Sequence, residues 1–230
     1  YDGDDPREQE IRKLADQLYR KVDWNWLQVR EPLVSMGWFP ESGFIPHDWM
    51  GYNEAMMLYV LALGSPTHPV EADAWTVWTR TYEHDWGVFQ DQEYLAFGPQ
   101  FGHQYSHVWI DFRGIRDEYM KNRGIDYFEN SRRAAYAQRA YAIENPMKWK
   151  DYGENVWGLT ASDDPTGYVA HSPTEDTGTI TPTAALSSFP FAPAEAMPVL
   201  RHLHDVLGAR IWGEAGFVDA FNPTRDWVAQ

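Results

Sequence analysis

Residues 52–63 read YNEAMMLYVLAL, and apolar side chains fill nearly every position of this stretch. Gly64 follows directly and Pro66 lies two residues beyond it, which is the usual pattern at the end of a helix. A helix that is apolar on all sides is buried on all sides. The sequence therefore predicts a central, buried helix over 52–63.

An amphipathic helix is predicted near the start of the chain. Asp5 can cap it, Pro6 suits its first position, and Glu8 can complete a capping box. Apolar residues then recur at spacings of three and four, which places on one helix face Ile11, Leu14, Leu18 and Val22.

The rest of the chain alternates helical patterns with long aromatic loops. Further helices are expected over 70–82, 113–122, 130–145 (opening at Asn130 or Ser131) and 193–207. Ordered loops are expected over 24–48 and 153–181, and a loop or short hairpin over 86–101. No run alternates apolar and polar residues for long enough to form a main sheet, and no linker divides the chain. We therefore expect an all-α fold in a single domain over 1–230.

The charge balance excludes several classes of partner. With 34 acidic and 19 basic side chains the net charge is −15, so the chain would repel nucleic acid and anionic membranes. The longest apolar run, 55–63, has nine residues, whereas a bilayer span needs roughly 20. The lack of cysteine excludes disulfides, thiolate nucleophiles and cysteine-ligated metals. Because the chain begins with Tyr1 rather than Met and no apolar leader follows, we expect a processed product or a fragment.

Aromatic residues make up 16% of the chain, with 12 Trp, 13 Tyr and 11 Phe. Indole rings stack on the apolar faces of sugars, and carboxylates and amides bind sugar hydroxyls. An acidic, Trp-rich chain therefore favours carbohydrate as its ligand. The alternative is that the aromatic rings only fill a core.

Glu54 is the first candidate for catalysis. A carboxylate within an apolar helix must be paired or lie at the mouth of a pocket. Burial raises the pKa of a carboxyl group, as a general acid near neutral pH requires. The alternatives are a salt bridge to a neighbouring helix and a favourable interaction with the helix dipole.

A second candidate site is the segment 153–164, GENVWGLTASDD, which combines three carboxylates, an amide and an indole with two glycines. Such a segment can present polar edges and a stacking face to one sugar. The alternative is a tight turn held by Asx hydrogen bonds. We expect Glu54, Glu154 and Trp157 to converge on one concave surface.

His103 and His107 have the HxxxH spacing, which on a helix places two imidazoles on one face for zinc. Neither an HExxH glutamate nor a third ligand is evident, so hydrogen bonds to a sugar or within the core are favoured. We expect no metal and no cofactor.

Five long motifs, in order along residues 2–227, carry a family resemblance. They are GYNEAMMLYVLALGSPTHPV (51–70), FGHQYSHVWIDFRGIRDEY (101–119), YGENVWGLTASDDPTGY (152–168), TPTAALSSFPFAP (181–193) and IWGEAGFVDAFNP (211–223). The chain resembles the glycoamylase-like family of bacterial proteins, whose relatives include endo-β-1,2-glucanases and the processing region of cyclic β-1,2-glucan synthases.

The resemblance implies an (α/α)6 toroid with a sugar cleft at one end of the ring. It also implies that Glu54, in the family's G-[WY]-N-E-A motif, is an essential acidic residue. Residues expected to bind the substrate are Trp38, Asp48, Tyr52, Asn53, His103, Tyr105, Glu154, Asn155, Trp157 and Asp163.

The chain also departs from the family pattern. Family members are longer, and a D-x-x-E motif with further acidic residues is expected in a segment before Tyr1. We therefore expect a partial (α/α)6 toroid, the C-terminal part of a larger barrel, which a second chain or segment would complete. Since a glycosidase needs two carboxyl groups, the partner of Glu54 is expected outside this chain or at Glu154 or Asp163.

The sequence thus predicts a bacterial glycoside hydrolase, periplasmic or secreted, that acts on a β-glucan, most plausibly β-1,2-linked, through carboxylate acid/base catalysis. Two alternatives stay open. One is a carbohydrate-binding remnant without complete catalytic machinery, and the other is an α-glucan glucoamylase.

Overall fold

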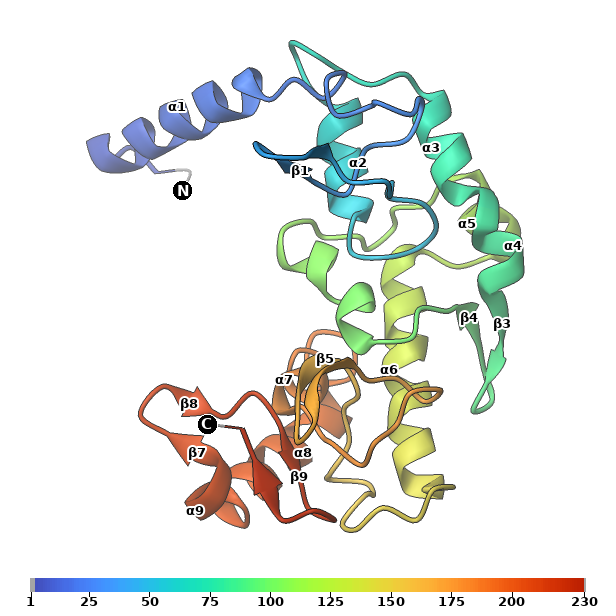
Figure 1. Cartoon of the computed structure of the whole chain (residues 1–230), viewed down its shortest axis with the longest axis vertical. Helices are drawn as coiled ribbons and strands as arrows, with labels where there is room; N and C mark the ends of the chain where they lie inside the picture. Colours follow the sequence, from blue (N-terminus) through green and yellow to red (C-terminus); the bar gives the residue numbers. More distant parts are fainter. Residues whose placement is uncertain (1–2, 230) are drawn as a thin grey trace. The chain divides into compact units, whose positions relative to one another are not determined.

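The computed structural model describes residues 3–229, which divide into two compact units between Glu83 and His84. Both units are rich in helices (Figure 1). The strands of the described residues pair only into two-stranded antiparallel sheets. The expectation of a helical chain without a main sheet is therefore confirmed.

The first unit begins with α1 (Pro6–Lys21), as the sequence predicts. Asp5 caps it by accepting a hydrogen bond from the backbone N–H of Arg7 at 2.8 Å. The predicted capping box is wrong, because the carboxylate of Glu8 accepts from the N–H of Gly3 at 2.8 Å instead of from Asp5. No residue of α1 is buried. Its apolar face is accordingly exposed, at Ile11, Leu14 and Leu18.

The core of the first unit is formed by α2 (Met56–Leu63) and α3 (Asp73–Trp78), which are followed by η1 (Thr79–Thr81) and α4 (Tyr82–Asp85). Tyr59 of α2 and Trp78 of α3 are fully buried, with ring centroids 5.4 Å apart. The Tyr59 hydroxyl donates to the carbonyl of Trp49 at 2.8 Å and accepts from the N–H of Val34 at 3.1 Å. These bonds fix the predicted loop, which contains the hairpin β1 (Trp38–Phe39) and β2 (Gly43–Phe44), against α2.

The predicted helix over 52–63 is corrected in two respects. It begins at Met56, because the Asn53 side chain accepts from the N–H of Ala55 at 2.9 Å and holds a turn before the helix. It is also not buried on all sides, since Val60 and Leu61 are 37% and 38% exposed. Glu54 therefore lies in a turn at the start of α2 and not within the helix.

The second unit contains the helix α6 (Tyr127–Glu144) and a series of shorter elements. The latter are β3 (Trp86–Phe89), β4 (Gln92–Leu95), η2 (Gln100–His103), η3 (Tyr105–Val108), α5 (Glu118–Arg123), β5 (Ala161–Asp164), β6 (Gly167–Ala170), α7 (Pro182–Leu186), α8 (Pro193–Asp205), α9 (Gly208–Ile211), β7 (Trp212–Gly213), β8 (Gly216–Phe217), β9 (Phe221–Asn222) and β10 (Trp227–Val228).

The helix α6 starts earlier than predicted. Asp126 caps it by accepting from the N–H of Glu129 at 2.7 Å. Asn130 is therefore inside the helix and fully buried, and its amide bonds to the N–H and the carbonyl of Leu95 at 2.7 and 3.1 Å. These two bonds hold the β3–β4 hairpin, which the sequence allowed for as a loop or hairpin, against α6.

A cluster of buried side chains joins the C-terminal elements of this unit. Trp157 lies in it with no exposed surface, packed among side chains from α6, α8 and β9. The core residues of the cluster are Ala142, Val156, Trp157, Ile180, Ala185, Val199, Leu203, Ile211 and Phe221. This core fixes the segments that carry the candidate residues of the second unit.

Candidate functional site

Glu54 combines a carboxyl group with partial burial. It lies in the turn between Asn53 and the first residue of α2, and desolvation by burial raises the pKa of its carboxyl group. A carboxyl group with a raised pKa holds its proton at a higher pH, which is what a general acid requires. The position therefore suits the predicted catalytic residue, although the turn rather than a helix presents it.

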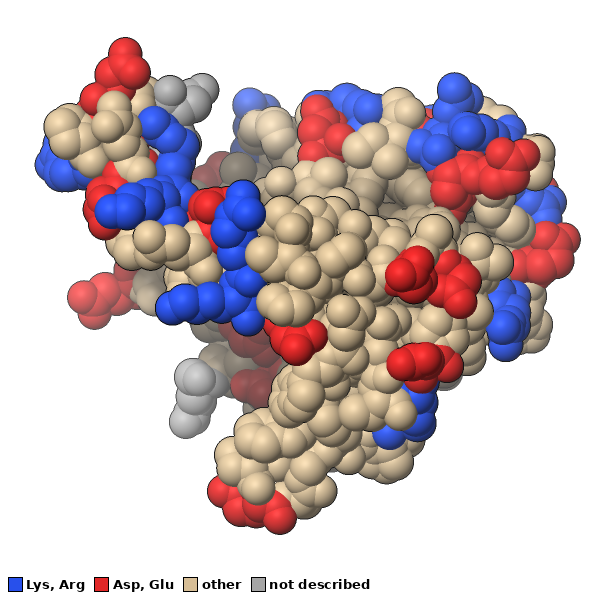
Figure 2. Space-filling model, turned by 90° about the horizontal axis from the view of Figure 1, so that it is seen from above, with Lys and Arg blue, Asp and Glu red and all other residues tan. Residues whose placement is uncertain are grey.

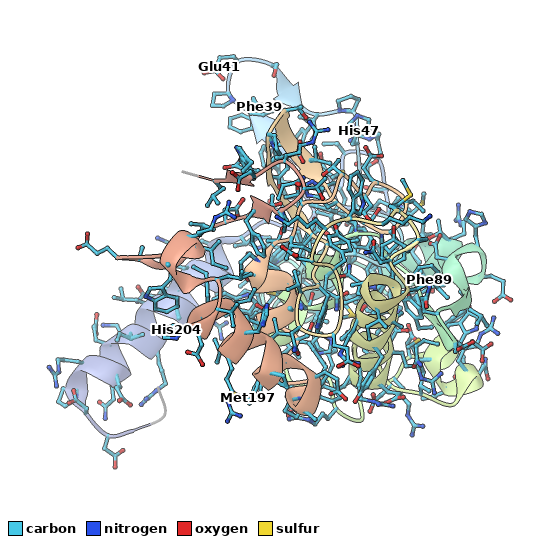
Figure 3. The ribbon with its side chains drawn as sticks, turned by 90° about the horizontal axis from the view of Figure 1, so that it is seen from below. Phe39, Glu41, His47, Phe89, Met197 and His204 are labelled. Carbon is cyan, nitrogen blue, oxygen red and sulfur yellow. The ribbon has the colours of Figure 1, made fainter. Side chains whose placement is uncertain are left out.

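Trp38 belongs to an exposed aromatic cluster in the first unit, formed by Trp26, Trp38 and Phe44. Trp26 and Trp38 are 50% and 44% exposed, and their ring centroids lie 5.7 Å apart in an edge-to-face arrangement. The Trp26 ring also lies 4.6 Å from Phe44. Phe39 and Glu41 follow at the tip of the same hairpin, as Figure 3 shows. The exposed indoles offer apolar surface to a sugar ring, and Trp26 is a residue that the sequence interpretation missed.

The other predicted residues of the first unit have structural partners. Both carboxylate oxygens of Asp48 bind the guanidinium of Arg30 at 2.7 Å, so this pair closes the loop. Tyr52 is 3% exposed and packs edge to face against Tyr82. The Asn53 amide is used by the turn before α2. Two of these side chains are thus buried and the third is paired with Arg30, and their binding to a sugar stays a prediction.

His103 and Tyr105 lie on consecutive 3₁₀ turns and differ in exposure. His103 is 1% exposed, and its Nε2 lies 3.2 Å from the N–H of Phe97. Burial lowers the pKa of His103 to about 3, so its imidazole is neutral near neutral pH. Tyr105 is 48% exposed and its ring is accessible. Of these two predicted residues, Tyr105 is therefore accessible to a ligand and His103 is buried.

Glu154 and Asn155 occupy the tip of a turn. The backbones of Gly153 and Val156 bond to each other in both directions, at 3.1 and 3.3 Å, and leave the two polar residues between them. Glu154 is exposed, with the guanidinium of Arg139 4.0 Å from its carboxylate. The predicted stacking of Trp157 on a sugar is wrong, because its ring is fully buried in the core. Trp157 and Glu154 consequently do not share a surface.

Asp163 is an exposed residue of β5, and its backbone N–H donates to the carboxylate of Asp219 at 2.8 Å. The structure thus places the exposed carboxylate of Asp219 against the backbone of Asp163, where the sequence interpretation named only Asp163. Asp219 lies within the motif over 211–223. Asp219 is identified as a candidate only by this hydrogen bond, whose two residues are 56 positions apart in the sequence.

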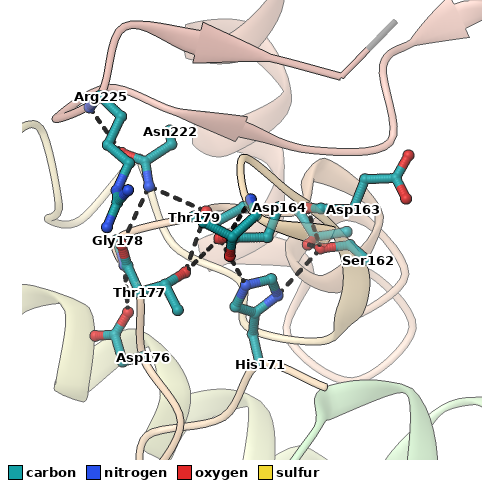
Figure 4. Close-up of polar contacts among 12 residues, drawn as sticks. Ser162, Asp163, Asp164, His171, Asp176, Thr177, Gly178, Thr179, Asn222 and Arg225 are labelled. Carbon is teal, nitrogen blue, oxygen red and sulfur yellow. Dashed lines mark hydrogen bonds and ion pairs between the residues drawn. The ribbon is translucent and has the colours of Figure 1, made fainter. Parts of the chain in front are cut away.

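The neighbouring carboxylate, Asp164, belongs to a buried polar network (Figure 4). It accepts hydrogen bonds from the hydroxyls of Thr177 and Thr179 at 2.7 and 2.8 Å, and from Thr166. His171 Nε2 lies 3.4 Å from it. Burial alone would raise the pKa of Asp164, but the hydroxyl bonds outweigh it and leave this pKa well below its ordinary value. The network holds the β5–β6 hairpin against the segment 177–179.

The surface carries both charges. Figure 2 shows Lys and Arg interspersed with Asp and Glu around a broad uncharged area. Among the described residues no group of three His, Asp or Glu side chains is arranged to hold a metal ion. In the same part of the chain, no helix has the length and apolar character needed to cross a bilayer.

Comparison with known proteins supplies the family. The family model described as "Putative glucoamylase" matches residues 46–230. The chain is also similar to an exo beta-1,2-glucooligosaccharide sophorohydrolase (non-reducing end) of Parabacteroides distasonis. The two sequences are 34% identical, and the match covers 100% of this chain and 35% of that protein.

Solved structures agree with this match. A putative glucoamylase from Bacteroides uniformis is 38% identical, with a TM-score of 0.91 over 99% of this chain and 56% of that one. An endo-beta-1,2-glucanase from Chitinophaga pinensis, in complex with sophorotriose and glucose, is 30% identical, with a TM-score of 0.90 over 99% of this chain and 56% of that one. The chain thus spans about a third to just over half of these relatives. It belongs to the glycoamylase family.

Proposed function

We propose that this chain is part of a glycoside hydrolase that acts on a β-1,2-linked glucan, with Glu54 as its general acid. The observation that carries the proposal is the partly buried carboxyl group of Glu54, whose raised pKa keeps a proton available for transfer. The relatives that hydrolyse β-1,2-glucans support the substrate class. In this reading the units form part of an (α/α)6 toroid, and the protein is exported to meet its glucan.

The reaction requires Glu54 to protonate the glycosidic oxygen as the bond breaks, while a second carboxylate acts on the opposite side of the sugar. Substitution of an exposed carboxylate elsewhere in this chain, at Glu154, Asp163 or Asp219, tests each of them for this second role. Trp38 and Trp26 would stack on sugar rings and hold the chain of the glucan, since their exposed indoles provide the apolar surface.

The test is Glu54→Gln in the full-length protein, assayed for hydrolysis of β-1,2-glucan and of sophorotriose. The amide is nearly isosteric but cannot donate the proton, so the hydrolysis rate should fall by roughly 10²–10⁴-fold while glucan binding persists. The matched control is Glu41→Gln at the exposed tip of the β1–β2 hairpin, which should leave the rate unchanged.

The same assay separates the other readings. Unchanged hydrolysis by Glu54→Gln would remove this residue from the mechanism. Binding of β-1,2-glucan without turnover by the wild-type protein would identify a binding module, and turnover of maltohexaose in preference to β-1,2-glucan would identify an α-glucan glucoamylase.

A further inference from the structure

The second unit contains a cavity of about 240 Å³ that the proposed function does not use. It lies between the β3–β4 hairpin, the segment 96–103 and α6. Of the residues that the sequence analysis selected as candidate site residues, only His103 borders it. Its lining consists of Phe89 (labelled in Figure 3), Tyr94, Ala96, Phe97, Gly98, Gln100, His103, Ala134, Gln138, Pro173 and Thr174.

The aromatic wall of this cavity is held in place by its neighbours. The Phe97 ring packs against Gly102 so closely that a Cβ at that glycine would lie 2.1 Å from the ring. The backbone of Phe97 is fixed by His103, whose Nε2 lies 3.2 Å from its N–H. Tyr94 packs with Ala134 of α6 in a small buried cluster, against which Phe89 also lies. The cavity is therefore built by fixed rings.

Two polar side chains of the cavity lining, Gln100 and Tyr94, set the hydrogen bonds that a ligand can make. Gln100 is 1% exposed, and within the described residues its amide nitrogen Nε2 has no hydrogen-bond partner. Tyr94 is 7% exposed, and burial raises the pKa of its hydroxyl to about 12, so this group stays protonated near neutral pH. By contrast the Gln138 amide is fully used, since it bonds to the N–H and the carbonyl of Leu159. A buried donor without a partner costs about 1–3 kcal/mol, so a ligand that accepts from Gln100 Nε2 would recover this free energy.

The chemistry of the lining restricts the ligand. No lining residue carries a charge near neutral pH, because burial lowers the pKa of His103 to about 3. A charged ligand would be left unpaired there. A hexose is also disfavoured, since most of its hydroxyls would be buried without partners.

We propose that the cavity binds a neutral, single-ring aromatic molecule with one hydroxyl group, a ligand of the phenol class. Its ring packs against Phe89 and Phe97, while its oxygen accepts a hydrogen bond from Gln100 Nε2 and donates one to the Tyr94 hydroxyl. The volume is sufficient, because an apolar cavity of about 150 Å³ already accommodates benzene in another protein. The inference does not depend on the proposed glucan hydrolysis.

The experiment titrates the chain with phenol and with toluene, which share a ring and differ in the hydroxyl, and measures binding by calorimetry and ligand-observed NMR. Wild-type protein should bind phenol saturably, with Kd below about 1 mM. Gln100→Met keeps the side-chain volume but removes the donor. It should weaken phenol binding by roughly threefold to tenfold, the value of one hydrogen bond, and leave toluene binding unchanged.

Ala134→Leu serves as the second variant, because a larger side chain on α6 fills the cavity and should abolish binding of both molecules. Circular dichroism confirms that each variant is folded. Absence of saturable binding to the wild type would overturn the proposal. So would equal loss of phenol and toluene binding in a folded Gln100→Met, or undiminished binding in a folded Ala134→Leu. Glucose should not compete with phenol, and competition by glucose would instead identify a sugar site.

Discussion

The imidazoles of His103, which is buried, and of His107, which is partly buried, predict that mild acid destabilises the second unit. Burial lowers the pKa of His103 from 6.5 to about 3 and that of His107 from 6.5 to about 4. Both imidazoles therefore stay neutral in the folded chain, whereas in the unfolded chain they take up protons below about pH 6.5. Because the unfolded state then binds more protons than the folded state, the free energy of unfolding falls as the pH falls.

The magnitude follows from these pKa values. Between about pH 7.5 and about pH 5, each histidine lowers the free energy of unfolding by about 2 kcal/mol, and the two together by about 4 kcal/mol. Asp164 and Glu129 do not contribute in this interval, because their lowered pKa values keep them ionised throughout. Glu54 acts in the opposite direction, since burial raises its pKa, but it belongs to the first unit.

The assay is urea-induced unfolding at the two pH values, followed by tryptophan fluorescence. His103→Gln and His107→Asn each remove one titrating group, so each should reduce the loss on acidification by about half, whatever its stability near neutral pH. His204→Gln is the matched control, because this imidazole is exposed and its replacement should leave the full loss in place. The reasoning is refuted if the double variant of His103 and His107 still loses about 4 kcal/mol, or if the wild type loses less than about 1 kcal/mol.

Three further substitutions test other parts of the structure. Trp157→Ala should lower the free energy of unfolding by about 3–5 kcal/mol in urea titrations, because a fully buried ring is removed; unchanged stability would contradict its burial. Trp38→Ala should weaken β-1,2-glucan binding by roughly threefold to tenfold in calorimetry, whereas the exposed Val88→Ala should not. Asp164→Asn should cost about 2–4 kcal/mol, since an amide has one acceptor oxygen and cannot accept from Thr177 and Thr179 on one side and from Thr166 on the other; a stability within about 0.5 kcal/mol of the wild type would show that the network is dispensable.

The local sequence patterns predicted the presence of the helices better than the residues at which the helices begin. The start of α1 follows from Asp5 and Pro6, whose cap and fixed backbone act within a few positions. The start of α6 was misplaced because Asn130, a good cap in isolation, instead bonds to Leu95 of the hairpin. That partner lies 35 residues away and leaves no trace in the local pattern.

The candidate site was predictable in part. Glu54 stands out because a carboxyl group next to an apolar run is unusual. Asp219 was missed because nothing around it differs from an ordinary surface aspartate, and only its contact with the backbone of Asp163 distinguishes it. Trp26 was missed for a related reason, since its neighbours Trp38 and Phe44 lie in a hairpin that the sequence did not resolve.

The segment 153–156 shows why a motif can contain both structural and exposed residues. The sequence left a tight turn and a sugar-binding segment as alternatives, and the structure supports the turn through backbone bonds between Gly153 and Val156 rather than through Asx bonds. The turn does not exclude the other reading, because it places Glu154 and Asn155 at its tip. Trp157 follows directly and anchors this turn in the core. A buried ring beside an exposed carboxylate therefore fixes the position of the carboxylate without itself contacting a ligand.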